Sequence, residues 1–200
     1  MAPERWLAVG LGNPEPEYAG TRHNIGADVV RALAKREGVT MSRNKRARGA
    51  VAEVDVDGTP LVLFVAEAFM NTSGDPVRAA ANWYKVPLDR LIVCHDDLDL
   101  PLGAVRCKRG GGNGGHNGLA DVQRAFGSPD YLRVRIGIGR PPGRIPGRDH
   151  VLGRFTADER DAADVAVDQA GAAVVSLVAD GLDVTQNTFH ARDVSPGAGA

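Results

Sequence analysis

The chain has 200 residues, of which 43% are hydrophobic and 24% charged, and its formal net charge is −1. This composition is ordinary for a globular domain with a sizeable core, and it argues against a chain that binds nucleic acid over its whole surface. The two cysteines, Cys94 and Cys107, are too few for a disulfide framework, and no apolar run approaches the ~20 residues of a membrane span.

The first half of the chain predicts strands that alternate with helices. Residues 6–11 form a short apolar run before Gly-Asn-Pro, which is typical of a buried strand that enters a loop. Residues 24–37 carry apolar side chains at helical spacing and end before a glycine. The alternating residues 52–56, an Asp-Gly turn and the apolar residues 61–65 indicate a β-hairpin. A helix over 73–85 follows.

The second half continues the alternation. Short apolar segments predict strands over 91–94, 104–108 and 132–138, with a helix over 119–126 before the last of them. An apolar stripe at helical spacing over 167–178 indicates a late helix.

This order of elements favours an α/β fold. We expect one three-layer domain over residues 1–190, in which a mixed, mostly parallel twisted sheet carries helices on both faces. Residues 191–200, which include SPGAGA, should form a disordered tail. The start of the chain lacks the pattern of a signal peptide, so a cytoplasmic protein is expected.

Small groups of polar residues follow the C-terminal ends of most predicted strands. Ligands of open α/β sheets bind beyond the carboxyl ends of parallel strands, so these groups are expected to converge on one pocket. They are Asn13, Tyr18 and His23 after the first strand, Asn71 after the hairpin, His95, Asp96 and Asp97 after the next strand, and His116 and Asn117 after a glycine-rich loop.

Two simple interpretations of the stretch HDDLDLPLGAVRCKRGGGNGGHNG, residues 95–118, fit poorly. It contains G-x-G-x-x-G, but the preceding strand is short and charged, which argues against a dinucleotide site. A metal site has plausible ligands in its histidines and aspartates. However, neighbours on an extended strand point to opposite faces, so His95 and Asp96 cannot easily bind one ion.

Acid–base catalysis fits the residue types better. Histidine is the commonest general base, and a carboxylate beside it fixes its tautomer. Asparagine amides can stabilise an oxyanion or hold a peptide backbone, and without a serine or cysteine in a nucleophile-elbow context the nucleophile should be water. Taken singly, Asn13 and Asn117 also suit turns or helix caps, and alternation does not choose among Asp96, Asp97 and Asp99. Their convergence is what favours catalysis.

Six segments taken together resemble bacterial peptidyl-tRNA hydrolases. In chain order they are GLGNP with Tyr18 after it, TRHNIG, FMNTSG, HDDLDLPLGAVRCKRGGGNGGHNGL, RVRIGIGRP and VLGRF. The resemblance covers nearly the whole chain from about residue 6, and it is far more specific than a lone glycine motif. It implies a monomeric cytoplasmic esterase without a cofactor or metal, which cleaves the ester between a peptide and the 3′ end of tRNA.

The resemblance also implies roles for individual residues. His23 resembles the general base, Asp96 the carboxylate that supports it, and Asn13 the residue that distinguishes blocked from free aminoacyl groups and orients the ester. Lys108 and Arg135 resemble the cations that clamp the 5′ phosphate of the tRNA. The positions that resemble contacts to the peptide and the terminal nucleotide are Tyr18, Phe69, Met70, Asn71 and Asn117.

Two segments depart from the family pattern. Glu15 stands where the family has the last glycine of GNPG, and residues 66–68 read Ala-Glu-Ala where Lys-Pro is usual. Both departures suggest a divergent paralogue in which added negative charge weakens RNA contact. The main alternative function is a noncatalytic RNA-binding homologue, because plant organelle relatives that serve in intron splicing resemble this family, and a metal-dependent hydrolase is a second alternative.

Positive charge is concentrated in two regions although the net charge is close to zero. Residues 43–48 contain four Lys or Arg, and a second basic region runs from 106 to 148. Acids gather later, over 158–168. Such separation permits an anion-binding surface on a nearly neutral protein, although solvated loops and helix faces explain the same charges about equally well.

Overall fold

A computed structural model describes residues 4–190 of the chain and has the α/β architecture that the sequence predicts. In this part of the chain, seven strands form one sheet in the order β2-β3-β4-β1-β5-β7-β6. The strands are β1 (Trp6–Gly10), β2 (Ser42–Asn44), β3 (Gly49–Val56), β4 (Thr59–Ala66), β5 (Leu91–Asp97), β6 (Val105–Arg109) and β7 (Leu132–Gly137). The expected tail at 191–200 lies outside the described residues.

The sheet is mixed, with a parallel centre. Strands β4, β1, β5 and β7 are parallel neighbours, whereas β3 pairs antiparallel with β4 and β6 pairs antiparallel with β7. Short β2 continues this pattern at one edge by pairing antiparallel with β3. The predicted hairpin is the β3–β4 pair, which turns at Asp57 and Gly58.

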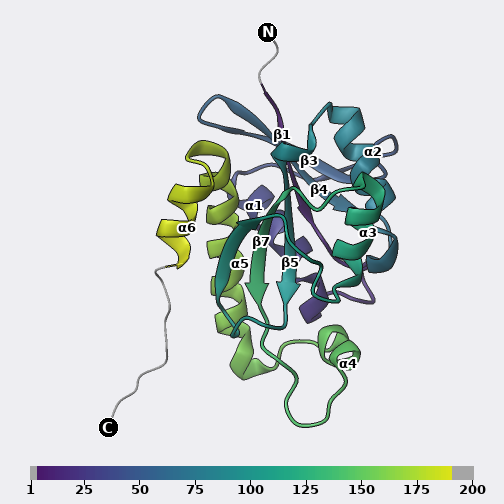
Figure 1. The fold of residues 1–200 in the computed structure, drawn as a ribbon, viewed down its shortest axis with the longest axis vertical. Helices are drawn as coiled ribbons and strands as arrows, with labels where there is room; N and C mark the ends of the chain where they lie inside the picture. Colours follow the sequence, from purple (N-terminus) through teal and green to yellow (C-terminus); the bar gives the residue numbers. More distant parts are fainter. Residues whose placement is uncertain (1–3, 191–200) are drawn as a thin grey trace.

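Helices cover both faces of the sheet, as predicted (Figure 1). On one face lie α1 (Ile25–Arg36), α5 (Ala157–Ala179) and α6 (Leu182–His190), and on the other lie α2 (Gly74–Tyr84) and α3 (Asn117–Phe126). Side chains alternate along β1, so that Ala8 packs in the core beneath α1 and α5, while Leu7 and Val9 pack in the core beneath α2 and α3. Because both faces are buried, the central strands are continuously apolar.

Three short helical turns and one short helix lie between these elements. The turns are η1 (Arg22–Asn24), η2 (Met70–Thr72) and η3 (Leu88–Arg90), and the helix is α4 (Gly147–Leu152). Figure 1 shows α4 beyond the arrowheads of β5 and β7, at the carboxyl ends of the parallel strands. The sequence did not predict α4, α6 or β2, which are short or carry no clear apolar period.

Two glycines bring the start of α1 against the sheet. A Cβ on Gly10 would lie 2.4 Å from the carbonyl oxygen of Gly26, and a Cβ on Gly26 would lie 2.2 Å from that of Cys94. Only glycine permits such contact between backbones. The turn η1, directly before α1, is therefore held beside the carboxyl ends of β1 and β5.

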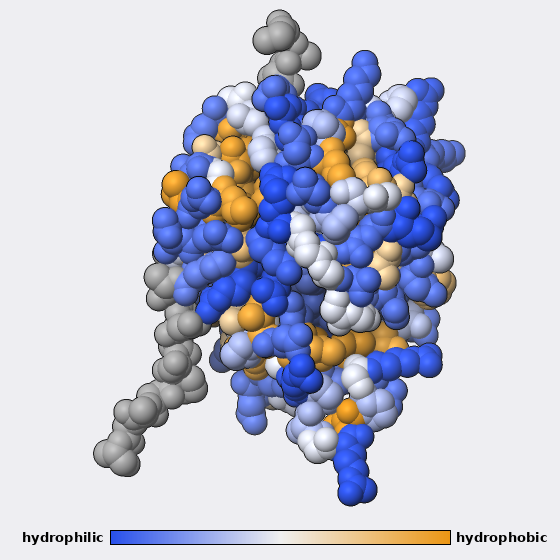
Figure 2. All heavy atoms as spheres, viewed as in Figure 1, coloured by the Kyte–Doolittle hydropathy of each residue, from blue (hydrophilic) through white to orange (hydrophobic). Residues whose placement is uncertain are grey.

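One helix, α5, is long and apolar enough to cross a membrane by length and composition alone. Its buried side chains, which include Ala166, Ala170 and Val174, belong to the core between α1 and the sheet. We therefore interpret α5 as a core helix. The face of the molecule in Figure 2 is mostly hydrophilic, and its apolar side chains form separate patches, as is usual for globular proteins.

Candidate active site

The carboxyl ends of the central strands open into a cavity of about 880 Å³. Strand β1 lies between β4 and β5, and the helices that follow β1 and β4 cover opposite faces of the sheet. Such a switch point is where open α/β sheets bind ligands. The cavity is lined by all ten sequence-predicted site residues, namely Asn13, Tyr18, His23, Phe69, Met70, Asn71, Asp96, Lys108, Asn117 and Arg135.

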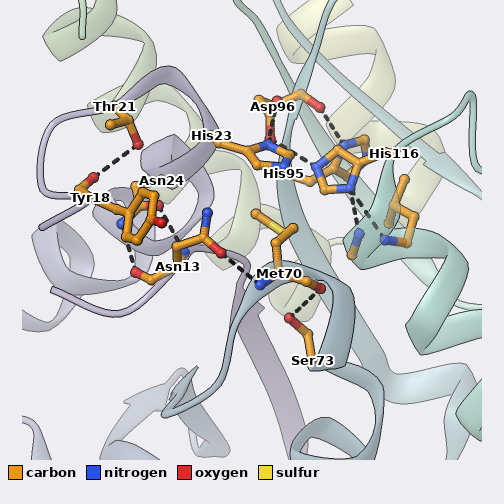
Figure 3. Close-up of polar contacts among 12 residues, drawn as sticks. Asn13, Tyr18, Thr21, His23, Asn24, Met70, Ser73, His95, Asp96 and His116 are labelled. Atoms are coloured by element: carbon orange, nitrogen blue, oxygen red, sulfur yellow. Dashed lines mark hydrogen bonds and ion pairs between the residues drawn. The ribbon is translucent and has the colours of Figure 1, made fainter. Parts of the chain in front are cut away.

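At the floor of the cavity, two histidines converge on one carboxylate (Figure 3). His23 Nδ1 lies 2.9 Å from Asp96 Oδ1 and 3.0 Å from Oδ2, and His116 Nε2 lies 2.8 Å from Oδ1. An ionised carboxylate only accepts hydrogen bonds, so both ring nitrogens donate. With its proton on Nδ1, neutral His23 carries its lone pair on Nε2, the atom that can accept a proton from a substrate.

The tautomer of His116 is fixed by the start of α3. Its Nδ1 accepts hydrogen bonds from the backbone N–H groups of Gly118 at 3.1 Å and Leu119 at 3.3 Å, which caps the helix. Since Nδ1 accepts, the proton lies on Nε2, which donates to Asp96. Protonation of Nδ1 would break the cap and place a positive charge at the positive end of the helix dipole. His116 thus donates from Nε2 to the carboxylate and orients it.

Asp96 remains ionised although it is 3% exposed. Burial alone would raise its pKa, but the charge and hydrogen bonds of His116 and His23 hold the pKa of this carboxyl well below its usual range. The neighbouring His95 behaves oppositely, because burial and His116 lower its pKa to about 3. His95 Nδ1 donates to the Asp96 carbonyl oxygen at 2.7 Å. The site therefore holds one buried anion that accepts hydrogen bonds from two imidazoles.

Asn13 is held so that its amide group faces the cavity. Its backbone N–H donates to Asn24 Oδ1 at 2.8 Å, and Asn24 Nδ2 donates back to its carbonyl oxygen at 3.0 Å. Asn13 Oδ1 accepts from the Met70 N–H at 2.7 Å, which identifies the other terminal atom as nitrogen. In Figure 3 this nitrogen points away from Met70, toward the side of the cavity on which His23 lies. It forms no hydrogen bond within the described chain and is available as a donor to a ligand.

Aromatic and amide side chains line the side of the cavity near Asn13. The rings of Tyr18 and Phe69 meet edge to face with centroids 6.3 Å apart, and Phe69 is 54% exposed. Asn71 lies in η2 and Asn117 begins α3. Apolar surface interspersed with amide groups suits a peptide or a nucleoside, because both combine flat or apolar parts with hydrogen-bonding edges.

Cations form the opposite side of the cavity. Lys108 on β6 lies diagonally across the β6–β7 pair from Arg135, and Arg135 Nε donates to Asp97 Oδ2 at 2.8 Å. Burial, Arg135 and Arg133 lower the pKa of Lys108. These cations therefore repel one another unless an anion is bound.

The glycine-rich loop packs on these cations. Arg133 is 1% exposed, and its two terminal nitrogens donate to the carbonyl oxygens of Gly111 and Gly112 at 2.6 and 2.7 Å. A Cβ on Gly111 would lie 2.7 Å from Lys108 Nζ, and Gly111 has a positive φ of 94°. The loop is therefore a structural part of the basic wall, and Arg133 is occupied in holding it.

Sequence reasoning missed several residues that build the site. His116 was noted near the pocket and as a plausible metal ligand but not as a partner of Asp96, although a histidine directly before a helix start was a usable signal of a cap. Asn24 and Arg22 gave no such signal. Asn24 holds the loop of Asn13, and Arg22 ties η1 to the start of α5 through a 2.6 Å ion pair with Glu159.

The structure groups different possible metal ligands from those that the sequence suggested. His95 and Asp96 were expected to point in different directions, but His116, at the start of α3, lies next to Asp96 instead. His23, Asp96 and His116 offer three ligand atoms within 4.8 Å of one another. The same atoms are joined by hydrogen bonds of 2.8–2.9 Å. Independence from metal therefore stays a prediction.

The two segments that depart from the expected pattern carry paired charges. Glu15 accepts from Arg31 at 2.6 Å, and Glu67 accepts from Arg43 at 2.8 Å. Neither glutamate lines the cavity. Their negative charges are partly neutralised by neighbouring arginines, which reduces the effect on an RNA ligand that was expected from the sequence.

Comparisons with known proteins agree with this architecture. Residues 7–197 match the family model for peptidyl-tRNA hydrolase. The chain is 53% identical to the peptidyl-tRNA hydrolase of Frankia casuarinae, covering 93% of this chain and 94% of the relative, and 45% identical to that of Streptomyces coelicolor, covering 92% and 94%. A crystal structure of peptidyl-tRNA hydrolase from Acinetobacter baumannii superposes with a TM-score of 0.87 at 36% identity, covering 93% and 94% of the two chains.

Proposed function

This chain belongs to the peptidyl-tRNA hydrolase family and hydrolyses the ester bond between a peptide and tRNA, and we propose that His23, Asp96 and Asn13 carry out this reaction. The observation that supports the assignment most is the hydrogen-bonded group His23–Asp96–His116 beside a free Asn13 amide. A single base and a single carbonyl donor are sufficient for an ester, which is already an activated acyl group.

His23 is the general base. With Nδ1–H donated to Asp96, its Nε2 accepts a proton from a water molecule as the water oxygen attacks the ester carbonyl carbon. Asp96 holds the imidazole orientation and stabilises the imidazolium that forms. When the tetrahedral intermediate collapses, the carbon–oxygen bond to the ribose breaks, and the imidazolium returns the proton to the leaving ribose oxygen. The products are a free peptide and deacylated tRNA.

Asn13 donates a hydrogen bond from Nδ2 to a carbonyl oxygen of the substrate. Its Oδ1 is occupied by the Met70 N–H, so the group that faces the cavity is a donor only. A donor at this position favours an acyl group that carries a peptide carbonyl over a free aminoacyl group, whose ammonium has no acceptor to offer. Selection for blocked aminoacyl groups follows from this single orientation.

The remaining cavity residues bind the rest of the substrate. Tyr18, Phe69 and Met70 offer apolar and aromatic surface, and Asn71 and Asn117 offer amide groups for the peptide and the terminal nucleotide. Lys108 and Arg135 hold the 5′ phosphate of the tRNA. Burial, together with repulsion from Arg135 and Arg133, lowers the pKa of Lys108, and the repulsion supports binding of an anion at this wall. We further propose that the protein works as a cytoplasmic monomer without a membrane, a cofactor or a metal.

The decisive experiment follows release of tRNA from N-acetylaminoacyl-tRNA by wild type and His23→Ala, with and without EDTA. Loss of a general base should lower kcat by roughly 10²–10⁴-fold while tRNA binding is retained. Wild-type turnover by His23→Ala would refute the mechanism. Loss of activity in EDTA that is regained on addition of Zn²⁺ or Mg²⁺ would instead favour the metal-dependent alternative at His23, Asp96 and His116.

A noncatalytic RNA-binding role has no feature of the site in its favour. A protein that only binds RNA does not require a buried histidine with a fixed tautomer, and the hydrogen bonds among His23, Asp96 and His116 provide one. Complete absence of hydrolysis in the wild type, together with retained tRNA binding, would support that alternative.

A further inference from the structure

A second groove lies outside the active-site cavity, between the β2–β3 turn and the C-terminal end of α2. Its volume is about 690 Å³, and none of the residues that line it belongs to the active-site cavity. We call it the hairpin groove and define it by Arg43, Asn44, Lys45, Arg46, Trp83 and Tyr84. It contains most of the basic cluster at 43–48, to which the proposed mechanism gives no role.

The turn that carries these cations is well ordered by hydrogen bonds. Asn44 Oδ1 accepts from the N–H groups of Arg46 and Ala47, both at 3.0 Å, and the Arg48 N–H donates to the Asn44 carbonyl oxygen at 2.9 Å. Asn44 Nδ2 also donates to the Tyr84 hydroxyl at 3.3 Å, which joins the turn to α2. Because the turn is fixed, the cations of the groove are presented in a defined arrangement.

Arg46 lies over the ring of Trp83, with its guanidinium carbon 4.6 Å from the ring centroid. Such pairs occur about once per 70–80 residues in proteins, so the pair alone indicates little. Here, however, it stands at an open groove and Trp83 is 44% exposed. An exposed indole in contact with a guanidinium offers a stacking surface and positive charge at the same place.

The charge of the groove is not neutralised by its own acids. Arg43 is paired with Glu67, and Glu53, the acid that lines the groove, lies 3.6 Å from Arg5. Lys45 and Arg46 have no ion-pair partner among residues 4–190. The groove therefore presents two uncompensated cations beside an aromatic ring.

We propose that the hairpin groove binds RNA, with an unpaired base stacked on Trp83 and with the backbone phosphates held by Lys45 and Arg46. Stacking on aromatic and guanidinium planes combined with cations is the usual chemistry of single-stranded RNA recognition. An acidic peptide would use the cations and leave the indole without a partner. The occupant is therefore RNA. We identify it with an unpaired segment of the substrate tRNA, and only this identification rests on the proposed function.

The position of the groove agrees with a second contact to the same substrate. The turn is joined to the end of β4, because Gly49 pairs with Ala66 and the Glu67 N–H donates to the Arg48 carbonyl oxygen. The chain then continues to Phe69 in the cavity. Strand β2 and Lys108-bearing β6 are opposite edges of a seven-stranded sheet, which at ~4.8 Å per strand are about 29 Å apart. A tRNA is long enough to contact both edges.

The test measures binding by fluorescence anisotropy, using deacylated tRNA, an unstructured 12-nucleotide RNA and a polyglutamate peptide as separate probes. Wild type is compared with Trp83→Ala, Trp83→Phe and Arg46→Ala, and Arg36→Ala serves as a control that removes one exposed arginine from α1. Melting temperatures verify that each variant is folded. Hydrolysis of an adenosine ester of an N-acetylated amino acid, a substrate without a tRNA body, is measured in parallel.

Trp83→Ala should weaken binding of both RNA probes by roughly 5- to 150-fold, and Trp83→Phe should weaken it less. Arg46→Ala should weaken it and reduce the slope of log affinity against log salt by about 0.7 per lost phosphate contact. Arg36→Ala should bind as wild type, and all variants should hydrolyse the short ester normally. Unchanged RNA binding by Trp83→Ala and Arg46→Ala would overturn the proposal, as would polyglutamate binding equal to that of RNA. Failure of wild type to hydrolyse the short ester would count against the proposed function, whereas the RNA-binding result would still decide the proposal for the groove.

Discussion

The two walls of the active-site cavity are built in opposite ways. On the catalytic side, His23, Asp96 and Asn13 are at least 92% buried, and each side chain is oriented by a hydrogen bond to a neighbour. On the basic side, Lys108 and Arg135 are partly exposed, and Arg135 is held by one carboxylate. Chemistry requires donors and acceptors that are already oriented when the transition state forms, whereas phosphate binding tolerates mobile cations. The difference predicts that substitutions on the catalytic side change kcat and those on the basic side change KM.

The largest effect is expected from Asp96→Asn. An amide in place of the carboxylate would no longer hold the Nδ1–H tautomer of His23, so kcat should fall by about 10²–10⁴-fold. Asp99→Asn is the matched control, because Asp99 is exposed and pairs with Arg140. Single-turnover hydrolysis of N-acetylaminoacyl-tRNA measures both. Equal rates for the two variants would contradict the special role of Asp96.

The next largest effect is expected from Asn13→Asp. The aspartate can still accept from the Met70 N–H, but it replaces the Nδ2 donor with an acceptor. Loss of a preorganised donor of this kind costs roughly 10²–10³-fold in kcat. Preference for blocked over free aminoacyl-tRNA should decline as well, and the ratio of the two kcat/KM values measures it. If the preference is kept in full, selection resides elsewhere in the cavity.

A smaller effect is expected from Lys108→Ala on the basic side. KM for full-length substrate should rise with little change in kcat, because a contact far from the ester contributes uniform binding. The salt dependence of kcat/KM should flatten by up to about one unit of slope. A short ester without a 5′ phosphate should be hydrolysed as by wild type. Comparable damage with the short ester would show that Lys108 maintains the glycine-rich loop rather than binding phosphate.

Arg135→Ala separates the two functions of the basic wall more finely. It should raise KM as Lys108→Ala does, but it also leaves Asp97 without its arginine. The unpaired carboxylate would then repel a phosphate, so the double variant Arg135→Ala/Asp97→Asn should recover part of the loss. Initial-rate kinetics on full-length substrate measure whether the double variant has a lower KM than Arg135→Ala. No recovery in the double variant would argue against electrostatic repulsion as the cause.

The smallest effect on turnover, with a measurable effect on stability, is expected from the neutral His95. Its pKa is about 3 in the fold and 6.5 unfolded, so the unfolded chain binds one more proton between these values. Stability is therefore lost as pH falls below 6.5, by up to about 2 kcal/mol at pH 5. Asp28, whose pKa burial raises to about 6, changes stability in the opposite direction over part of this range.

The contribution of His95 is isolated by comparing wild type with His95→Asn in urea unfolding at pH 7 and pH 5. Because Asp28 is common to both proteins, the difference between them reports His95 alone. The variant should lose less stability on acidification than wild type. An identical pH dependence of the two would show that His95 takes up a proton in the fold.

The sequence by itself determined the architecture and the chemistry of the cavity. Apolar runs of strand length alternating with periodic helical segments are local signals, so the strands of the parallel centre and their helices were predicted within a few residues. Polar residues after strand ends indicated a pocket, and the resemblance of six segments predicted roles for them that stay predictions. Elements without a strong local period, such as α4 and β2, were missed because tertiary packing rather than sequence pattern stabilises them.

Only the tertiary structure decided how the side chains divide their hydrogen bonds. Alternation along the chain left Asp96, Asp97 and Asp99 equivalent and only the family resemblance selected Asp96, whereas the fold distinguishes all three. Asp96 is buried between His23 and His116, Asp97 pairs with Arg135, and Asp99 pairs with Arg140 at the surface. The physical reason is that the role of a carboxylate depends on its neighbours in space, and these neighbours lie 20 to 73 residues away in the sequence. Those neighbours are set by strand register and by the backbone contacts of Gly10 and Gly26, which no local pattern encodes.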